Sequence, residues 1–321
     1  MRILFAGTPE FAVPSLRALV AAGHDVVGVI TREDAPLGRK RVLTPSPVAV
    51  VAEELGIETL RANRLGEDAT AWAAERGAEL GVIVAYGGLL REPLLSLPEH
   101  GWINLHFSDL PRWRGAAPVQ RALMAGEQEL GVTVFRLVEA LDAGDVLTRD
   151  AQTFPPGTSA GAALTALASS GTGALLAAVA ALADDPAAGE PQVGADTYAH
   201  KLTREDGLIA FGADAAGGAG MSTGGAGMST GAALAHWAGV TPEPGAYALL
   251  DGQPVKLTEL RPFAGEVPAD LAVGEARLVG RTAMLGCADG ALELARVQPA
   301  GKPAMDGNDW LRGRGGKAEL A

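Results

Sequence analysis

The chain of 321 residues contains a single cysteine, Cys287, so it can form no internal disulfide. So little cysteine suits a reducing compartment, and we expect a cytoplasmic protein. We interpret Cys287 as a small buried hydrophobic residue rather than a catalytic thiol. The opening apolar run at residues 1–7 is too short for a signal peptide, and Thr8-Pro9 breaks it.

The sequence also lacks a basic segment. Its formal net charge is −12, with 15 basic and 21 acidic side chains in residues 1–184 and 11 and 17 in residues 185–321. This balance counts against a dedicated nucleic-acid domain but permits a local basic patch. The Ala-rich stretch 160–183 contains Gly171 and Gly173 and several hydroxyl side chains, so we predict a soluble helix there and no membrane span.

Signatures of several ligand classes are absent. The loop at residues 7–12, GTPEFA, is not G-x-G-x-x-G, and Glu10 would repel a dinucleotide pyrophosphate. A nicotinamide dehydrogenase is therefore disfavoured. No Walker loop occurs, and the five histidines show no metal-ligand spacing with cysteine or carboxylates, so we predict no protein-bound metal.

The apolar runs that are present predict an α/β fold. Residues 2–6 and 25–31 read as strands separated by a helix, a unit that predicts a parallel sheet. Residues 80–86 are almost wholly apolar, as in a strand buried on both faces. The remaining predicted elements are strands at 103–107, 132–138 and 146–154 and helices at 115–125 and 158–183.

The composition changes after residue 184. Residues 184–196 are rich in Asp, Pro, Gly and Ala without apolar periodicity, and we interpret 185–204 as a linker. Short runs separated by Gly or Asp turns then predict a small β-barrel, with strands at 247–250, 254–260, 276–279, 283–287 and 291–297. We therefore assign a first domain to residues 1–184 and a second to residues 205–321.

One segment of the second domain is duplicated. The sequence GAGMSTG at residues 218–224 recurs without change at 225–231. It offers many glycines and few side chains to bury, so we interpret it as a flexible, solvated insertion. No chemical role follows from its residues.

The predicted strand at 103–107 carries two polar side chains, Asn104 and His106, which share a face because they lie two residues apart. Asparagine can donate to a developing oxyanion, and histidine can donate or move a proton. With a carboxylate from the loop at 141–145 nearby, this set suits acyl transfer to an amine without a covalent enzyme intermediate. From spacing alone, a purely structural His106 stays an open alternative.

The densest cationic run in this acidic chain is Arg39-Lys40-Arg41, in a polar loop. From the residues alone, a solvated loop and a contact with nucleic-acid phosphates are both open. The loop ends at Thr44-Pro45-Ser46-Pro47, where a helix is expected to begin.

Six segments carry a resemblance to a known family: residues 5–12 (FAGTPEFA), 43–48 (LTPSPV), 84–87 (VAYG), 104–106 (NLH), 108–118 (SDLPRWRGAAP) and 141–145 (LDAGD). Together they resemble the methionyl-tRNA formyltransferases, over nearly the whole chain. The Asn-x-His and Asp-x-Gly-Asp set marks the wider superfamily that uses 10-formyltetrahydrofolate. The opening segment and the second domain narrow the resemblance to the tRNA enzymes.

The resemblance implies a Rossmann-like, mostly parallel formyltransferase domain followed by a small OB-like β-barrel. It implies transfer of the formyl group of 10-formyltetrahydrofolate to the α-amine of methionyl initiator tRNA, by a monomer. Asn104, His106 and Asp142 would be the catalytic residues. The residues implied in the folate pocket are Ser108, Asp109, Leu110 and Pro111, and Asp109 stands where the family usually has Leu.

For the tRNA, the resemblance implies two contacts. The loop holding Arg39, Lys40 and Arg41 would wedge into the acceptor stem, and Lys201 matches a linker lysine that lies near the tRNA. Two other functions stay open at this point. A formyltransferase for a small amine, such as an amino-sugar nucleotide, would need neither the cationic loop nor a barrel. A non-catalytic RNA-binding protein would not need all three catalytic residues.

Overall fold

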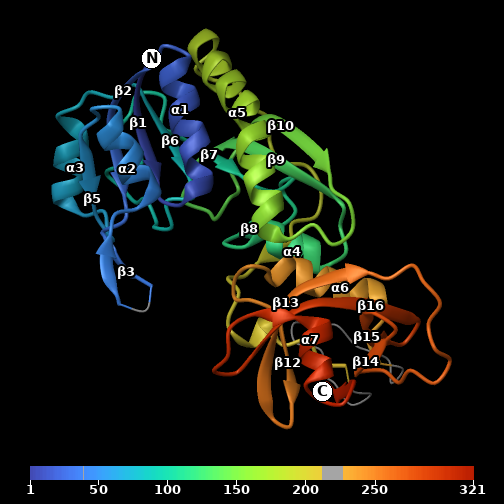
Figure 1. The fold of residues 1–321 in the computed structure, drawn as a ribbon. Coiled ribbons are helices and arrows are strands. Elements are labelled where there is room, and N and C mark those ends of the chain that lie inside the picture. The colour runs from blue at the N-terminus through green and yellow to red at the C-terminus, as the bar shows by residue number, and fades with distance from the viewer. Residues whose placement is uncertain (39, 212–226) are drawn as a thin grey trace. The chain divides into compact units, whose positions relative to one another are not determined.

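The computed structural model describes residues 1–38, 40–211 and 227–321, which form two compact units (Figure 1). The first unit comprises residues 1–118, 129–152 and 164–199. The second comprises residues 119–128, 153–163 and 200–321. Each unit is therefore assembled from several separate stretches of the chain.

The first unit is built on a seven-stranded sheet in the order β10-β9-β7-β6-β1-β2-β5. Its strands are β1 (Arg2–Gly7), β2 (Asp25–Thr31), β5 (Thr59–Arg61), β6 (Leu80–Val84), β7 (Trp102–His106), β9 (Glu129–Arg136) and β10 (Val146–Thr153). The neighbours from β7 to β5 pair in parallel, and β9 pairs with β7 antiparallel. This arrangement confirms the predicted α/β fold with a mostly parallel sheet.

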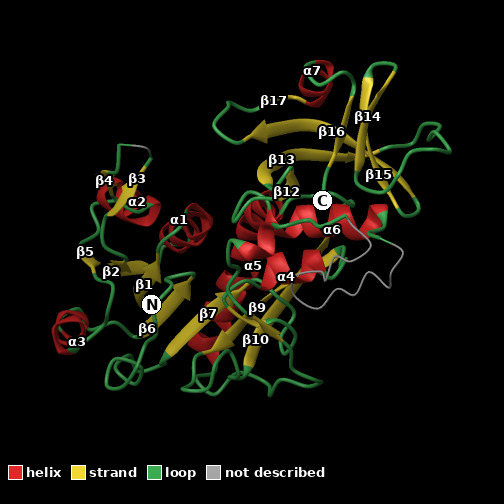
Figure 2. Ribbon diagram, turned by 90° about the horizontal axis from the view of Figure 1, so that it is seen from below, coloured by secondary structure: helices red, strands yellow, loops and turns green. Residues whose placement is uncertain are grey.

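Helices cover both faces of this sheet. Figure 2 shows α1 (Val13–Ala21) and α2 (Pro47–Glu54) on one face and α3 (Glu67–Ala74) on the other. Helix α5 (Ala160–Asp184) packs over β7 and β9, because a Cβ placed on its Gly171 would lie 3.5 Å from Leu105 and 3.6 Å from Val132. By length and composition α5 could also cross a membrane, which is weak evidence for a span, and 44% of its apolar window is buried.

The predicted polar loop between β2 and α2 contains a β-hairpin instead. Strands β3 (Ala35–Leu37) and β4 (Val42–Thr44) pair antiparallel in a sheet of their own. The turn between them uses the left-handed region at Gly38 (φ 69°) and at Arg41 (φ 50°). The sequence reading missed it because the strands are only three residues long and exposed, so no alternating buried face marks them.

The second unit is an antiparallel, nearly closed barrel, which confirms the predicted β-barrel. Its strands are β12 (Tyr247–Leu250), β13 (Gln253–Pro262), β14 (Glu275–Val279), β15 (Thr282–Cys287), β16 (Gly290–Pro299), β17 (Met305–Asp306) and β18 (Lys317–Glu319). They follow the order β12-β13-β16-β15-β14-β18, with β17 on β16. Two backbone hydrogen bonds between Leu249 and Ala321 bring the two ends of this order together.

The second unit also includes most of α4 (Pro118–Met124), the 3₁₀ turn η2 (Glu205–Gly207) and α7 (Gly307–Arg312). The side chain of Met124 lies in the same buried cluster as the barrel residues. Residues 119–124, predicted within a helix of the first domain, therefore pack with the second unit.

The end of the duplicated segment is structured. Met228 is buried in the barrel core, and Ser229 Oγ accepts a hydrogen bond from the Ala232 N–H as the N-cap of α6 (Thr230–Val240). The reading of a solvated insertion is therefore wrong for residues 227–231, because they start a buried helix. Residues 218–226, which hold the rest of the repeat, lie outside the described residues.

Cys287 is buried in the same core, as predicted. Burial raises the pKa of its thiol to about 12. Because the thiolate is the reactive form, this thiol is inert at neutral pH in the folded protein.

Glu275 on β14 is a buried carboxylate that forms ion pairs with two cations of the barrel. Glu275 is 3% exposed, and its Oε1 lies 2.5 Å from Arg277 Nε and 3.4 Å from Lys317 Nζ. The Arg277 guanidinium lowers the pKa of the Glu275 carboxyl from 4.5 to about 2. A carboxyl with a depressed pKa stabilises the fold above pH 4.5, and this stabilisation is lost as the pH falls from 4.5 towards 2.

We expect Glu275→Gln to lower the free energy of unfolding at pH 7 by on the order of 2 kcal/mol. The difference from the parent should shrink at pH 3, where part of the ionic stabilisation is already lost. Urea unfolding at both pH values measures it. Glu319→Gln, at the exposed position opposite Glu275 on β18, is the control. An equal difference at both pH values would contradict the assignment.

Candidate active site

Strand β7 presents Asn104 and His106 on one face and Ile103 and Leu105 on the other, as the alternation predicts. Leu105 faces α5, and Phe107 meets Phe11 edge to face with ring centroids 5.5 Å apart. On the opposite face, Trp102 packs with buried residues of β1 and β6. Apolar packing on both faces therefore fixes the strand, and the two polar side chains lie at its carboxyl end.

The imidazole of His106 is held by the backbone of the following loop. His106 is 7% exposed, and its Nε2 lies 3.0 Å from the Trp113 carbonyl oxygen. A carbonyl can only accept a hydrogen bond, so Nε2 must carry the proton. The ring also packs edge to face on Phe135 at 6.3 Å. Its tautomer and its plane are thus set without a carboxylate.

Asn104 is the free donor of the pair. It is partly exposed, and its carboxamide makes no hydrogen bond to any residue that the structure describes. Its backbone is fixed between Ile83 on β6 and Phe135 on β9. The side chain can therefore donate to a ligand oxygen without first giving up a partner.

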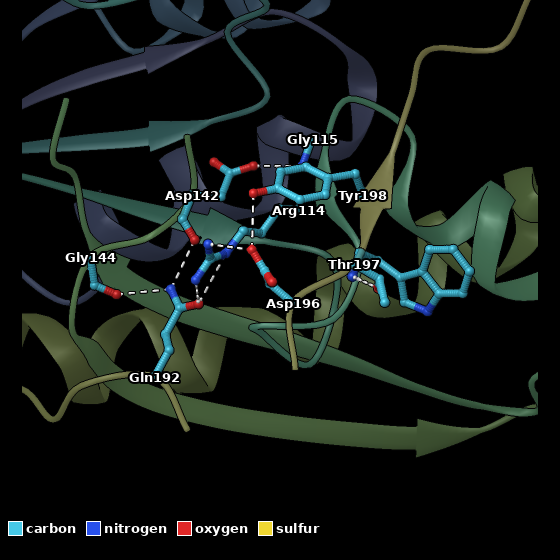
Figure 3. Close-up of polar contacts among 9 residues, drawn as sticks. Arg114, Gly115, Asp142, Gly144, Gln192, Asp196, Thr197 and Tyr198 are labelled. Carbon is cyan, nitrogen blue, oxygen red and sulfur yellow. Dashed lines mark hydrogen bonds and ion pairs between the residues drawn. The ribbon is translucent and has the colours of Figure 1, made fainter. Parts of the chain in front are cut away.

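Asp142 is 8% exposed, and its carboxylate points at the same loop (Figure 3). Its Oδ2 accepts a hydrogen bond from the Gly115 N–H at 2.7 Å. The residue has φ 47°, in the left-handed region that side chains other than glycine adopt rarely. The backbone on either side of it must hold this conformation in place.

The backbone from Trp113 to Gly115 therefore joins the two titratable residues. His106 binds the Trp113 carbonyl, and Asp142 binds the Gly115 N–H. Trp113 itself has φ 60°, and its N–H donates to Thr197 Oγ1 at 2.9 Å. The structure thus brings His106 and Asp142 to one short stretch of backbone, where the groups that they bind belong to residues two positions apart.

The segment predicted for the folate pocket is a fixed turn. Ser108 Oγ donates to the Arg112 carbonyl at 2.7 Å, and Thr133 on β9 binds the segment through the Ser108 carbonyl and the Leu110 N–H. Pro111 is buried. The charge of Asp109, unusual at this position, is paired with Arg149, so it does not stand alone beside the site.

The cationic residues that are predicted to contact tRNA lie elsewhere in the sequence. Lys40 and Arg41 are exposed in the turn of the β3–β4 hairpin, and Arg39 lies outside the described residues. Lys201 is exposed in the second unit, two residues after β11 (Tyr198–Ala199). Within the described residues, no group of three or more His, Cys, Asp or Glu side chains could hold a metal ion.

Two residues at the site have no predicted role. Gln192 and Arg114 bind each other, and Gln192 also binds the backbone around Asp142 (Figure 3). Arg114 lies within a resembling motif, but nothing in its pattern gives it a partner. Gln192 sits in a segment without periodicity, so the sequence offered no signal for it.

Comparison with known proteins gives the family. The family model for formyl transferases matches residues 1–179, and the model for the formyl transferase C-terminal domain matches residues 228–315. A methionyl-tRNA formyltransferase of Leifsonia xyli subsp. xyli is 51% identical over 322 residues, covering 100% of both chains. Another, of Clavibacter sepedonicus, is 52% identical over 314 residues, covering 98% of this chain and 97% of its own. The chain belongs to the methionyl-tRNA formyltransferase family.

A solved structure shares the fold. HypX from Aquifex aeolicus in complex with tetrahydrofolic acid has a TM-score of 0.63 and 16% identity, over 97% of this chain and 47% of HypX. At that identity the likeness shows the fold alone. Between them, the two family models leave residues 180–227 of this chain uncovered, and that interval includes Gln192.

Proposed function

We propose that this chain transfers the formyl group of 10-formyltetrahydrofolate to the α-amine of methionyl initiator tRNA, in the cytoplasm and as a monomer. The full-length likeness to methionyl-tRNA formyltransferases supports this reaction. The observation that carries it is that His106 and Asp142 both bind the backbone of residues 113–115, while β7, the strand of His106, also carries the carboxamide of Asn104.

The three side chains have separate tasks in this proposal. Asn104 donates to the formyl oxygen while the neutral amine attacks the formyl carbon. His106 can donate to the same oxygen through Nδ1 when both of its ring nitrogens carry protons, because the Trp113 carbonyl already accepts from Nε2. Asp142 accepts the proton that the amine loses, through water, and returns it by the same route to the folate nitrogen as the bond from that nitrogen to carbon breaks. No covalent enzyme intermediate is needed.

The residues present fit a formyl donor that supplies an oxygen acceptor beside β7. The carboxamide N–H groups of Asn104 can donate to such an acceptor. The turn at residues 108–111 is already held in place by the hydrogen bonds of Thr133. The Asp109–Arg149 pair leaves little net charge next to an anionic folate. We therefore assign folate contact to Ser108, Asp109, Leu110 and Pro111.

One assay tests the reaction against its rivals. The protein is incubated with 10-formyltetrahydrofolate and, separately, charged initiator tRNA, charged elongator tRNA or an amino-sugar nucleotide. We expect the formyl group on the initiator tRNA. Formylation of only the amino-sugar nucleotide would favour the small-amine enzyme, and no transfer to any acceptor would favour a binding protein.

We further assign tRNA contact to Arg39, Lys40, Arg41 and Lys201. The hairpin that carries Lys40 and Arg41 also exposes Leu37, and cations beside exposed apolar side chains suit contact with both phosphates and bases. The chain is acidic overall, so binding should rest on few phosphate contacts and depend only weakly on salt.

Arg41→Ala should raise KM for charged initiator tRNA and reduce the slope of log affinity against log salt by about one. Arg17→Ala removes the same charge from α1, where Arg17 pairs with Glu54, and should leave the slope unchanged. Filter binding from low to high salt measures both. Equal slopes for the two variants would remove Arg41 from the tRNA contact.

A further inference from the structure

The segment after α5 runs along the loops of the candidate active site. Glu190 and Val146 exchange two backbone hydrogen bonds, at 2.8 and 2.9 Å. Strand β11 pairs in parallel with β8 (Arg114–Gly115), and the Ala199 carbonyl accepts from the Ala116 N–H at 2.9 Å. Residues 185–199 belong to the first unit. This segment is therefore part of the structure around Asp142.

Gln192 in this segment binds the backbone around Asp142 on one side and Arg114 on the other (Figure 3). Its Nε2 donates to the carbonyl oxygens of Asp142 and Gly144, at 2.8 and 2.9 Å. Its Oε1 accepts from Arg114, at 2.7 Å from Nη2 and 3.3 Å from Nε. The opposite amide orientation would set oxygen against two carbonyls and NH₂ against a guanidinium, so the chemistry fixes the assignment.

These bonds close a ring around the carboxylate. Asp142 Oδ2 binds the Gly115 N–H, Gly115 follows Arg114, Arg114 binds Gln192, and Gln192 binds the Asp142 carbonyl. One amide side chain thus sets the separation between the two backbone stretches that hold the carboxylate. Arg114 is anchored in turn by Asp196, at 3.2 Å, and Asp196 accepts from the Tyr198 hydroxyl at 2.9 Å.

The left-handed conformation of Asp142 is where such support matters. A residue other than glycine is strained in this region, and the conformation persists only where its surroundings require it. Gln192 supplies two hydrogen bonds to the backbone that leaves this residue. We propose that Gln192 is a positioning residue that holds the Asp142 carboxylate in its reactive orientation. This inference rests on the catalytic role proposed for Asp142.

Two substitutions separate positioning from folding. Gln192→Met keeps the length of the side chain and removes all its hydrogen bonds. Gln192→Glu keeps the acceptor for Arg114 but replaces the two donors by a charge facing two carbonyls. Misplacing a catalytic group by about 1 Å can cost about 10²-fold in rate. We therefore expect kcat to fall about 10- to 100-fold in both variants, with the larger loss in Gln192→Glu.

The measurement is steady-state formylation of charged initiator tRNA by the full-length chain, expressed per folded molecule after urea titration. We expect KM for the tRNA and for 10-formyltetrahydrofolate to stay within about threefold of the parent, because a positioning residue acts on the reacting step. Val193→Ala, next in the chain and 85% exposed, should keep the parent kcat and KM.

Asp142→Asn is measured in the same series. If Asp142→Asn is slow while both Gln192 variants keep the parent kcat, the positioning role is overturned and the role of Asp142 stands. If Asp142→Asn keeps the parent kcat, the catalytic role of Asp142 fails and the inference fails with it. A raised KM at unchanged kcat in the Gln192 variants would also overturn positioning, because it would indicate a binding contact.

Discussion

Purified His106→Ala should formylate charged initiator tRNA at least 10²–10³-fold more slowly than the parent protein, and Asn104→Ala should fall in the same range. Losing one donor to a developing oxyanion typically costs that much in kcat. Both residues lie on β7, whose position depends on the apolar side chains of its other face. The loss should therefore appear in kcat at unchanged secondary structure and similar thermal stability.

The matched control is His100→Ala. His100 is partly exposed before β7, and its imidazole makes no hydrogen bond to the described residues. This variant should keep the parent rate. Circular dichroism and thermal melts of all three variants show whether the fold is retained. A folded His106→Ala protein that formylates at the parent rate would remove His106 from the proposed mechanism.

Much of this site followed from sequence because its parts are regular. An alternation of two places Asn104 and His106 on one face wherever β7 is paired on both sides, and it is paired with β6 and β9. The same reasoning gave the barrel strands, where apolar runs alternate with glycine turns. The choice of Asp142 within the loop at 141–145, and the role proposed for it, came from the family resemblance, because nothing local predicts which backbone a distant carboxylate will reach.

What sequence reasoning missed depends on irregular backbone. Trp113 and Asp142 both have positive φ, and neither is a glycine that would mark such a conformation. The contacts of Gln192 run to backbone carbonyls 48 and 50 residues away, so no local spacing encodes them. Asp109, which stands where the family usually has Leu, is paired with Arg149, again far along the chain. Long-range polar contacts of this kind are visible only in three dimensions.

Gly144 offers the sharpest test of how tightly the Asp142 loop must be held. A Cβ at Gly144 would lie 1.8 Å from the Arg136 carbonyl oxygen, and a backbone oxygen cannot turn away as a side chain can. The backbone carbonyl of Asp145 accepts from the Arg136 N–H at 2.8 Å, so Arg136 holds the loop directly after Gly144. Gly144→Ala must therefore displace the backbone next to Asp142.

We expect Gly144→Ala to lower the free energy of unfolding by roughly 2–3 kcal/mol, because an added methyl group overpacks a site with no room for it. Because the displaced backbone also carries the carbonyl that Gln192 binds, kcat per folded molecule should fall by about 10²-fold or more. Urea unfolding gives the first quantity and the folded fraction, and steady-state formylation at 25 °C gives the second.

Gly173→Ala is the matched control for this change. Gly173 is exposed within α5, and a Cβ there would meet nothing within 4 Å. The substitution should raise the free energy of unfolding by about 0.5–1 kcal/mol, because alanine loses less backbone entropy than glycine in a helix. Its kcat should equal that of the parent. If Gly144→Ala matched the parent in both stability and kcat, the close contact with Arg136 would not constrain the loop, and the geometry around Asp142 would not set the rate.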